Sequence, residues 1–340
     1  MNYIGSKHKL SSFIFETVTN TCGTDLSQKT FCDLFAGTGI VGRTFRPHTK
    51  QIISNDVEFY SYVLNRNYIG NDFEFEYDGF LDELNTLKGI KGFIFENYSK
   101  GGKAGRNYFT LENGQKIDAV RTQIEDWKNA KTISEDHYFF LLASLLESSD
   151  KVANTASVYG AYLKQIKKSA AKPLIIEPAL LVKDLFSDYL KSQENRIYQK
   201  DANQLINEIN GDILYIDPPY NARQYGANYH LLNTIAKYDT FVPRGKTGLR
   251  EYYKSDWCRR GEVLKSFEEL IENAQFSYIF LSYNNEGLMS EKQVQSVMER
   301  FGKYNLETKK YQRFKADKTE NRNHRATETF EYLHILEKSL

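Results

Sequence analysis

The tetrapeptide Asp217-Pro218-Pro219-Tyr220 carries the most specific chemistry in the sequence, and it directly follows the apolar run 213–216. Two prolines after a buried strand force a rigid, extended exit, which fixes the Asp217 carboxylate and the Pro218 carbonyl side by side. Both groups are acceptors, and an exocyclic amine offers two donors. An amine held in this way localises its lone pair in line with the methyl group of a sulfonium, while Tyr220 stacks on the ring. The pattern predicts methylation of an amine on a flat ring.

A loop with two glycines follows the predicted strand Thr30–Phe35. The loop spans Asp33–Gly39, and Gly37 and Gly39 lack the Cβ atoms that would keep a ligand away from the backbone. Open α/β sheets bind cofactors at the carboxyl ends of their strands, where this loop is expected to lie. By itself, the Gly-x-Gly spacing fits a structural turn as well as a cofactor site.

Two further segments fit a nucleoside cofactor that carries a sulfonium. Asp56 ends the next apolar run, where a carboxylate can accept hydrogen bonds from both ribose hydroxyls. The alternative for Asp56 is the N-cap of the following helix, but its distance from the glycine loop favours the cofactor role. At the N-terminus, a Gly-Ser-Lys turn ending at Lys7 follows Tyr3, whose aromatic face suits a sulfonium cation.

Composition excludes some classes of protein and leaves others open. The formal net charge of the 340 residues is only +1, so overall charge does not point to a nucleic-acid partner and local clusters must make that case. The three cysteines (Cys22, Cys32 and Cys258) form no Cys-x-x-Cys, and the six histidines have no metal-binding spacing, so we expect free thiols and no metal. Neither a membrane-spanning run nor a signal peptide is visible, which predicts a cytoplasmic protein.

The elements that must position these residues alternate along the chain. Helical patterns at Tyr60–Tyr68 and His230–Lys237 each follow an apolar run, which predicts a parallel, doubly wound sheet. The final two strands have no helix between them and are expected to form an antiparallel hairpin. The predicted strands are Thr30–Phe35, Gln51–Asn55, Arg196–Gln199, Asp212–Ile216, Tyr278–Ser282, Leu306–Arg313 and Thr329–Leu336.

A long stretch between the second and third predicted strands interrupts this alternation. It contains strongly helical runs at Asp136–Ser148 and Pro178–Gln193. We therefore predict an α/β fold in which residues 1–70 and 196–340 form one domain and residues 71–195 form a mostly helical inserted domain.

Taken together, these motifs resemble the Dam-like, D12 class (alpha group) of N6-adenine DNA methyltransferases. Their order, from N-terminal loop through glycine loop, acidic residue and insert to Asp-Pro-Pro-Tyr, follows that class over nearly the whole chain. The resemblance implies a Rossmann-like S-adenosylmethionine (SAM)-dependent methyltransferase sheet, SAM as cofactor, and double-stranded DNA as substrate. It also implies that the adenine is flipped out of the duplex and that the insert is the target-recognition domain.

The resemblance also implies roles for individual residues. The catalytic loop would be Asp217, Pro218, Pro219 and Tyr220. The implied cofactor-binding residues are Tyr3, Lys7, Asp33, Phe35, Ala36, Gly37, Thr38, Gly39, Asp56, Val57, Asp201, Ala202 and Asp217.

A segment after the catalytic loop, Asn221–His230, is similar to a subgroup of restriction-modification methylases that includes relatives of the FokI modification enzyme. A cognate restriction endonuclease acting on the same site is therefore a possible partner. The chain departs from the best-known members at two positions, Tyr3 in place of Trp and Ser6 in place of a second Gly.

DNA binding requires phosphate contacts, a base reader and a means of extracting the base. Basic segments occur at Lys88–Arg106, Lys164–Lys172, Arg244–Arg260 and Phe314–Glu328, although any single cluster is more often a solvated face. The polar stretch 282–285 fits either base contact or a simple turn. The predicted DNA-binding residues are Arg223, Tyr225, Asn228, Arg244, Lys246, Arg250, Tyr283, Asn284, Asn285, Lys315, Arg322, His324 and Arg325.

Several rival functions remain open on the sequence alone. Enzymes with Asn-Pro-Pro-Tyr methylate glutamine or guanine, and cytosine-N4 enzymes more often carry Ser-Pro-Pro-Tyr, so Asp217 favours adenine. An RNA adenine methyltransferase and a catalytically inactive DNA-binding protein of the same fold are the main alternatives. A dinucleotide oxidoreductase fits less well, because the third glycine is missing and Asp-Pro-Pro-Tyr would have no role.

Overall fold

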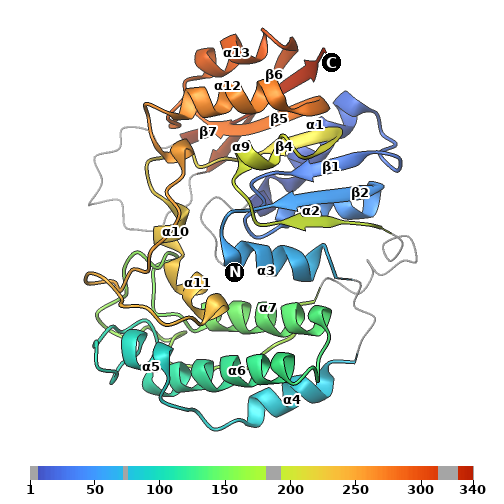
Figure 1. The fold of residues 1–340 in the computed structure, drawn as a ribbon. Coiled ribbons are helices and arrows are strands. Elements are labelled where there is room, and N and C mark those ends of the chain that lie inside the picture. Colours follow the sequence, from blue (N-terminus) through green and yellow to red (C-terminus); the bar gives the residue numbers. More distant parts are fainter. Residues whose placement is uncertain (1–6, 72–75, 181–192, 313–327, 340) are drawn as a thin grey trace. The chain divides into compact units, whose positions relative to one another are not determined.

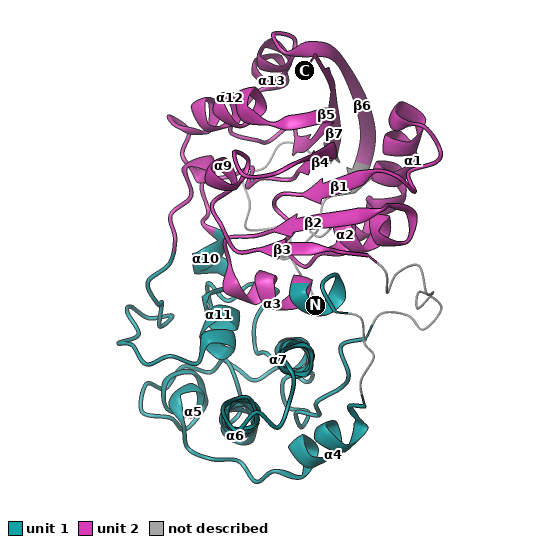
Figure 2. Cartoon of the chain, turned by 45° about the vertical axis from the view of Figure 1, so that its right-hand side comes forward, with its two compact units in different colours: residues 1–4, 66–183, 225–252 teal, residues 5–65, 184–224, 253–340 magenta. Residues whose placement is uncertain are grey.

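The computed structural model describes residues 7–71, 76–180, 193–312 and 328–339. The chain forms two compact units (Figure 2). One, here called the sheet unit, contains Gly5–Asn65, Asp184–Gln224 and Tyr253–Leu340. The other, the helical unit, contains Arg66–Lys183 and Tyr225–Tyr252.

The sheet unit is built on seven strands in the order β3-β2-β1-β4-β5-β7-β6 (Figure 1). Strands β1 to β5 run parallel to one another, while β7 runs antiparallel to both β5 and β6. The predicted α/β sheet with a terminal antiparallel hairpin is therefore confirmed. The strands are β1 (Thr30–Asp33), β2 (Gln51–Asn55), β3 (Arg196–Tyr198), β4 (Asn210–Ile216), β5 (Gln275–Asn284), β6 (Gly302–Gln312) and β7 (Glu328–Lys338).

Both faces of this sheet are buried, because side chains that alternate along the strands pack against helices on either side. On one face, Phe31 of β1 stacks on Phe45 of α2 with ring centroids 4.0 Å apart. On the other face, Cys32 joins a buried cluster with Leu270 and Val294 of the covering helices. Figure 2 shows α1 (Ser11–Cys22) and α2 (Ile40–Phe45) on the first face, and α9 (Ala202–Leu205), α12 (Val263–Asn273) and α13 (Glu291–Met298) on the second.

Shorter elements complete the sheet unit. They are the 3₁₀ helices η1 (Lys7–Lys9), η2 (Arg46–His48) and η4 (Asp256–Cys258). Helix α3 (Phe59–Tyr68) follows β2, which confirms the predicted helix Tyr60–Tyr68. None of the described helices has the length and apolar character of a membrane span.

The helical unit packs α6 (Leu111–Asn129) against α5 (Phe93–Tyr98) and α7 (Glu135–Lys151). The Thr110 side chain caps the start of α6 by accepting from the Asn113 N–H, and Ser134 caps α7 in the same way. Helix α7 confirms the predicted helix Asp136–Ser148, whereas the predicted helix Pro178–Gln193 lies almost wholly outside the described residues. The unit also contains α4 (Asp78–Thr86), α10 (Tyr225–Asn228) and α11 (His230–Lys237).

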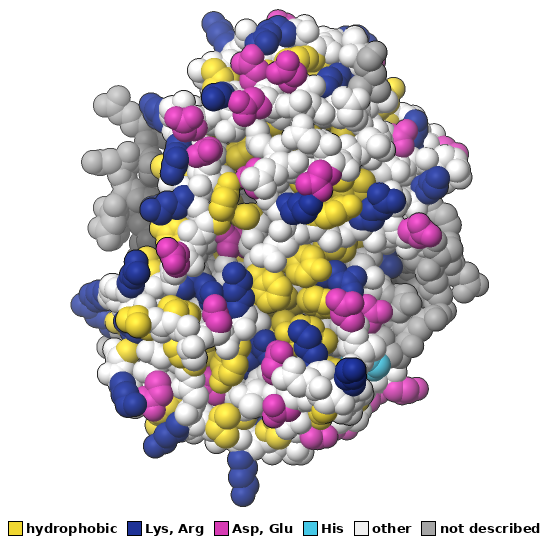
Figure 3. Space-filling model, viewed as in Figure 1, with side chains coloured by type: hydrophobic (Ala, Val, Ile, Leu, Met, Phe, Trp, Pro, Cys, Tyr) yellow, Lys and Arg dark blue, Asp and Glu magenta, His cyan; other side chains and the backbone are white. Residues whose placement is uncertain are grey.

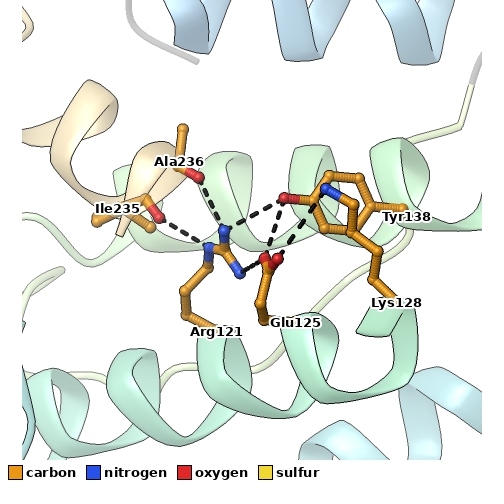
Figure 4. A network of polar contacts seen from close by, with 6 residues as sticks. All are labelled: Arg121, Glu125, Lys128, Tyr138, Ile235 and Ala236. Atoms are coloured by element: carbon orange, nitrogen blue, oxygen red, sulfur yellow. Dashed lines mark hydrogen bonds and ion pairs between the residues drawn. The ribbon is translucent and has the colours of Figure 1, made fainter. Parts of the chain in front are cut away.

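Helix α11 belongs to the helical unit although it follows the tetrapeptide Asp217–Tyr220 in sequence. The buried Arg121 of α6 donates to the carbonyls of Ile235 and Ala236 at the end of α11, with distances of 3.2 and 3.1 Å (Figure 4). The same guanidinium donates to Glu125 at 2.7 Å and to the Tyr138 hydroxyl at 3.2 Å. Segment 225–252, which the sequence analysis grouped with the catalytic domain, is thus fastened to the helices of the insert.

Candidate active site

Three of the predicted site segments follow adjacent strands. In the sheet, β1 lies between β2 and β4, and Asp33 is in register with Ser54 on one side and Tyr215 on the other. Because these strands are parallel, the glycine loop, Asp56 and Asp217 leave the sheet at the same edge. This convergence was expected from the sequence, and the structure describes each of the three segments.

The glycine loop after β1 depends on backbone conformations that favour glycine. Gly37 and Gly39 have φ angles of 53° and 75°. The Gly37 N–H donates to Asp56 Oδ2 at 2.8 Å, and the Gly39 N–H donates to the Ala36 carbonyl at 2.8 Å. The loop and the acidic residue of the next strand are therefore one hydrogen-bonded structure, which the sequence spacing alone did not show.

Asp56 holds its carboxylate in place through two backbone donors. In addition to Gly37, the Glu58 N–H donates to Asp56 Oδ1 at 2.9 Å. Burial raises the pKa of Asp56 to about 6, against the opposing effect of these two hydrogen bonds. Each carboxylate oxygen retains a further lone pair, so the geometry is compatible with both the capping role and the ribose-binding role.

Asp33 is among the predicted cofactor-binding residues, but its side chain is almost completely buried. The residue is 1% exposed, and Asp33 Oδ2 accepts from the Gly42 N–H at 3.0 Å. Burial raises the pKa of this carboxyl to about 8. The described contacts therefore give Asp33 the task of holding the glycine loop against the start of α2.

Asp201, one of the implied cofactor-binding residues, accepts a hydrogen bond from a tyrosine. Asp201 Oδ1 accepts from the Gln204 N–H at 3.0 Å and so caps α9. Asp201 Oδ2 accepts from the Tyr253 hydroxyl at 2.6 Å. Ala202 is 5% exposed and packs in the core. Sequence reasoning missed Tyr253, because it lies 52 residues away and in no recognisable motif.

A tryptophan supports the aromatic residue of the glycine loop. Trp257 of η4 meets Phe35 edge to face, with ring centroids 5.1 Å apart. Its indole N–H donates to Asn203 Oδ1 at 3.0 Å. Trp257 is one of two tryptophans in the chain, a composition signal that could have marked it for attention.

The carboxylate of Asp217 lies in a buried network of charges. Lys7 Nζ is 3.1 Å from Asp217 Oδ1 and 2.6 Å from Glu331 Oε1. The Ser282 hydroxyl also donates to Glu331 Oε1, at 2.7 Å. Lys7 was predicted from its sequence position, but Glu331 was not. A glutamate within the apolar run of a predicted strand was the signal that could have found it.

Opposing influences set the pKa of Asp217. Burial is the largest and raises it, Lys7 lowers it, and Glu331 raises it, with the result that the pKa is raised to about 6. The same two carboxylates raise the pKa of Lys7 against the effect of burial, which keeps its ammonium charged. Asp217 is therefore a stronger base than an ordinary aspartate.

The rest of the Asp217–Tyr220 loop is fixed to the core. The Tyr220 carbonyl accepts from the Leu288 N–H at 3.1 Å, and the Tyr220 ring packs against the buried cluster that includes Tyr283. The Tyr283 hydroxyl accepts from the N–H groups of Leu288 and Met289 at 3.1 and 3.4 Å. Tyr283 is thus a buried support of this loop in the described structure.

The polar residues after Tyr283 form a turn. Asn284 Oδ1 accepts from the Glu286 N–H at 3.0 Å, and Asn285 Oδ1 accepts from the Phe330 N–H at 3.3 Å. These contacts correspond to the turn alternative for the stretch 282–285. A DNA contact by Asn284 or Asn285 stays a prediction.

The structure separates the predicted DNA-binding residues into different environments. Arg223, Arg244 and Lys246 are exposed. Arg250 is 9% exposed and donates to both carboxylate oxygens of Asp239. Basic and acidic side chains are intermixed on the face shown in Figure 3, in keeping with the small net charge.

Other predicted residues are partly packed or lie outside the described part of the chain. Tyr225 stacks on Tyr229 with ring centroids 6.0 Å apart, and the Asn228 carbonyl accepts from the Tyr159 N–H. The predicted residues Tyr3, Lys315, Arg322, His324 and Arg325 lie outside the described residues. Among the described residues, no cluster of three or more His, Cys, Asp or Glu side chains could hold a metal ion.

Comparison with known proteins extends the argument from geometry to family. A model of the D12 class N6 adenine-specific DNA methyltransferases matches residues 3–298. The type II methyltransferase M.NlaIII of Neisseria lactamica is 62% identical over 340 residues, which cover 100% of both chains. M.FokI of Planomicrobium okeanokoites is 38% identical over 100% of this chain and 53% of its own length. M.CviAII of Paramecium bursaria Chlorella virus 1 is 39% identical over 93% of each chain.

These matches confirm the resemblance seen in the sequence, including its FokI-like subgroup, and they support a restriction-modification role. The Asp-Pro-Pro-Tyr loop follows β4, and the glycine loop follows the neighbouring parallel strand β1. The chain belongs to the D12 class of N6 adenine-specific DNA methyltransferases, and it is an enzyme that methylates adenine in DNA.

Proposed function

We propose that this enzyme binds SAM at the carboxyl edge of β1, β2 and β3 and presents the target adenine amine to it at Asp217. The observation that carries the proposal is the hydrogen bond from the Gly37 N–H to Asp56, which joins the glycine loop to the acidic residue of the neighbouring strand. Methyltransferases of this family use SAM, and the residues at this edge fit its parts.

The fit rests on the donor and acceptor groups described above. The glycine loop allows close approach of the methionine part, with Phe35 beside it. Asp56 has lone pairs for the ribose hydroxyls. Asp201 accepts from the Tyr253 hydroxyl, and an adenine amine is a donor of the same kind. We assign cofactor contacts to Tyr3, Lys7, Phe35, Ala36, Gly37, Thr38, Gly39, Asp56, Val57, Asp201, Ala202 and Asp217, and a supporting role to Asp33.

The methyl donor supplies a carbon attached to a positively charged sulfur. Lys7 engages Asp217 Oδ1, so we assign Oδ2 and the Pro218 carbonyl as acceptors for the two amine hydrogens. These two acceptors localise the lone pair on N6 and orient it for direct transfer. The amine loses one proton when it gains the methyl group, and Asp217 can hold that proton before it passes to water, because its pKa is raised to about 6. Tyr220 supports the flipped base.

On the DNA side, we propose that the helical unit recognises the target sequence and that the sheet unit supplies the catalytic residues. The exposed Arg223, Arg244 and Lys246 would contact phosphates. A cognate restriction endonuclease would act on the same site in the cytoplasm, since the type II methyltransferase M.NlaIII matches this chain over the full length of both proteins.

The cofactor assignment is tested by replacing Asp56 with Ala and measuring the dissociation constant of SAM by calorimetry. We expect binding to weaken by at least about tenfold, which corresponds to loss of one or two charge-assisted hydrogen bonds. Glu58→Ala is a neighbouring control, because the hydrogen bond from Glu58 to Asp56 Oδ1 comes from its backbone N–H, which the substitution keeps. Unchanged SAM affinity in the Asp56 variant would refute the assigned site.

A further inference from the structure

The segment Tyr253–Cys258 of the sheet unit, here called the 253–258 segment, holds the start of α9 at two points. The Tyr253 hydroxyl donates to Asp201 Oδ2 at 2.6 Å, and the Trp257 indole N–H donates to Asn203 Oδ1 at 3.0 Å. All four residues belong to the sheet unit. The 253–258 segment therefore contacts the turn that carries Asp201, which we assigned to the cofactor.

The 253–258 segment is itself fixed to the sheet unit. Trp257 is 2% exposed, and its ring meets Phe35 of the glycine loop edge to face. The Ser255 N–H donates to Gln224 Oε1 at 2.9 Å, and Gln224 Nε2 donates back to the Ser255 carbonyl at 3.1 Å. Tyr253 is 44% exposed, but the backbone two residues further along is anchored on both its donor and its acceptor.

A buried amide joins Asp201 to the rest of the proposed cofactor edge. Asn55 Nδ2 donates to the carbonyls of Leu34 and Lys200, both at 3.1 Å, and the Lys200 N–H donates to Asn55 Oδ1 at 3.0 Å. This side chain thus ties together the chain segments at the ends of β1, β2 and β3. Asp56 directly follows Asn55, and Asp201 directly follows the lysine. The acid assigned to the ribose and Asp201 are therefore held at one edge, as the two ends of a nucleoside require.

The two oxygens of Asp201 are each held by a donor. Oδ1 accepts from the Gln204 N–H at 3.0 Å, and Oδ2 accepts from Tyr253. Burial and the neighbouring Asp201 carboxylate raise the pKa of Tyr253, so its hydroxyl stays protonated and donates. A carboxylate oxygen has two lone pairs, so Oδ2 keeps one acceptor position whose direction these contacts fix.

We propose that Tyr253 is a positioning residue for the cofactor adenine, which holds Asp201 so that Oδ2 accepts a hydrogen bond from the exocyclic amine of SAM. A nucleoside with a carbonyl oxygen in place of that amine would present a lone pair to the carboxylate and bind poorly. Tyr253 thus contributes to selection of adenine, and it does so through Asp201. This inference rests on the proposed function, since it requires SAM at this edge of the sheet.

The test compares two ligands, S-adenosylhomocysteine and S-inosylhomocysteine, which carries a carbonyl oxygen where adenine has its amine. Calorimetry gives their dissociation constants for the wild type and for Tyr253→Phe. We expect the variant to bind the adenosyl ligand about fivefold more weakly, and the inosyl ligand within about twofold of the wild type. In methylation of duplex DNA, KM for SAM should rise while kcat stays within about twofold, because Asp217 and its charged neighbours are unchanged.

Tyr252→Phe is the matched control, because it removes a hydroxyl from the adjacent residue, which is not among the described donors to Asp201. Both dissociation constants should stay at their wild-type values. Equal weakening of the two ligands by Tyr253→Phe would overturn the inference, because it indicates a general disturbance of the site. Unchanged affinity for both ligands would overturn it as well, as would tighter binding of the adenosyl ligand, because Tyr253 would then compete with the amine.

A variant of Asp201 separates this inference from the proposed function. Asp201→Asn keeps the oxygen that caps α9 and replaces Oδ2 by an amide nitrogen, which cannot accept a hydrogen bond. It should weaken binding of S-adenosylhomocysteine by about tenfold. Unchanged affinity in this variant would overturn the adenine contact of the proposed function. A loss in Asp201→Asn without a loss in Tyr253→Phe would overturn the role of Tyr253 alone.

Discussion

At the scale of single residues, the account depends on the charges around Asp217. Lys7 lies between Asp217 and Glu331, and it lowers the pKa of the first while Glu331 raises it. If Asp217 must be ionised to accept from the amine, activity falls as the pH drops through about 6. Substitution of the two neighbours should then move this acid limb in opposite directions.

Replacing Lys7 with Met removes the cation that favours ionised Asp217, so the pKa of Asp217 should rise. We expect the acid limb of the kcat profile to move to higher pH, with a lower plateau because Asp217 loses its positioning contact. The measurement is the rate of single-turnover methyl transfer from about pH 5 to about pH 9, with SAM and DNA at saturating concentrations.

Replacing Glu331 with Gln removes a nearby negative charge, so the pKa of Asp217 should fall and the acid limb should move to lower pH. Glu337→Gln is a suitable control, since Glu337 lies on the same strand and pairs with the exposed Lys303. Shifts in the same direction for the Lys7 and Glu331 variants would contradict the proposed electrostatics.

At the scale of elements, the buried Arg121 fastens α6 to α11 (Figure 4). Replacing Arg121 with Met should lower the free energy of unfolding by about 2–4 kcal/mol, because two carbonyls and Glu125 lose a charged donor. Lys128→Met, at an exposed partner of Glu125 with an Nζ–Oε1 distance of 4.0 Å, should cost less than about 0.5 kcal/mol. Urea unfolding measures the free energy of unfolding of both variants. An Arg121 variant that loses no more stability than the Lys128 variant would contradict this role of Arg121.

The strands were predictable because their apolar runs have a short period and end at polar residues. Gln51–Asn55 was predicted with the observed bounds, as was the helix His230–Lys237. The placement of α11 was not predictable, because it depends on the carbonyls at its end meeting Arg121, more than 100 residues earlier. Long-range contacts of this kind leave no local pattern.

The candidate site shows the same division. The glycine loop, Asp56 and Asp217 could be found because each follows a strand, and neighbouring strand ends meet at one edge. Glu331, Tyr253 and Trp257 come from distant segments and act through single side chains. Their roles depend on the fold, so the sequence alone could not assign them.

At the scale of the whole molecule, the described residues of the helical unit come from two separate stretches, Arg66–Lys183 and Tyr225–Tyr252. We expect that exchanging residues 71–195 and 225–252 together with those of a D12 enzyme of different specificity transfers the recognised sequence. Exchanging 71–195 alone should give an unstable protein, because α11 would lose the partner of its terminal carbonyls. Mapping of methylated adenines shows whether the recognised sequence is transferred, and thermal unfolding measures the stability of each exchange. A stable single exchange with transferred specificity would contradict this division.

The central claim is that Asp217 orients the adenine amine for methyl transfer. Its most direct test is the single-turnover rate of methyl transfer to duplex DNA by Asp217→Ala, with SAM binding measured on the same preparation. The account predicts that transfer falls by at least about a thousandfold while SAM still binds, because Asp56 and the glycine loop are intact. A variant that binds SAM and methylates adenine at a rate near that of the wild type would contradict it.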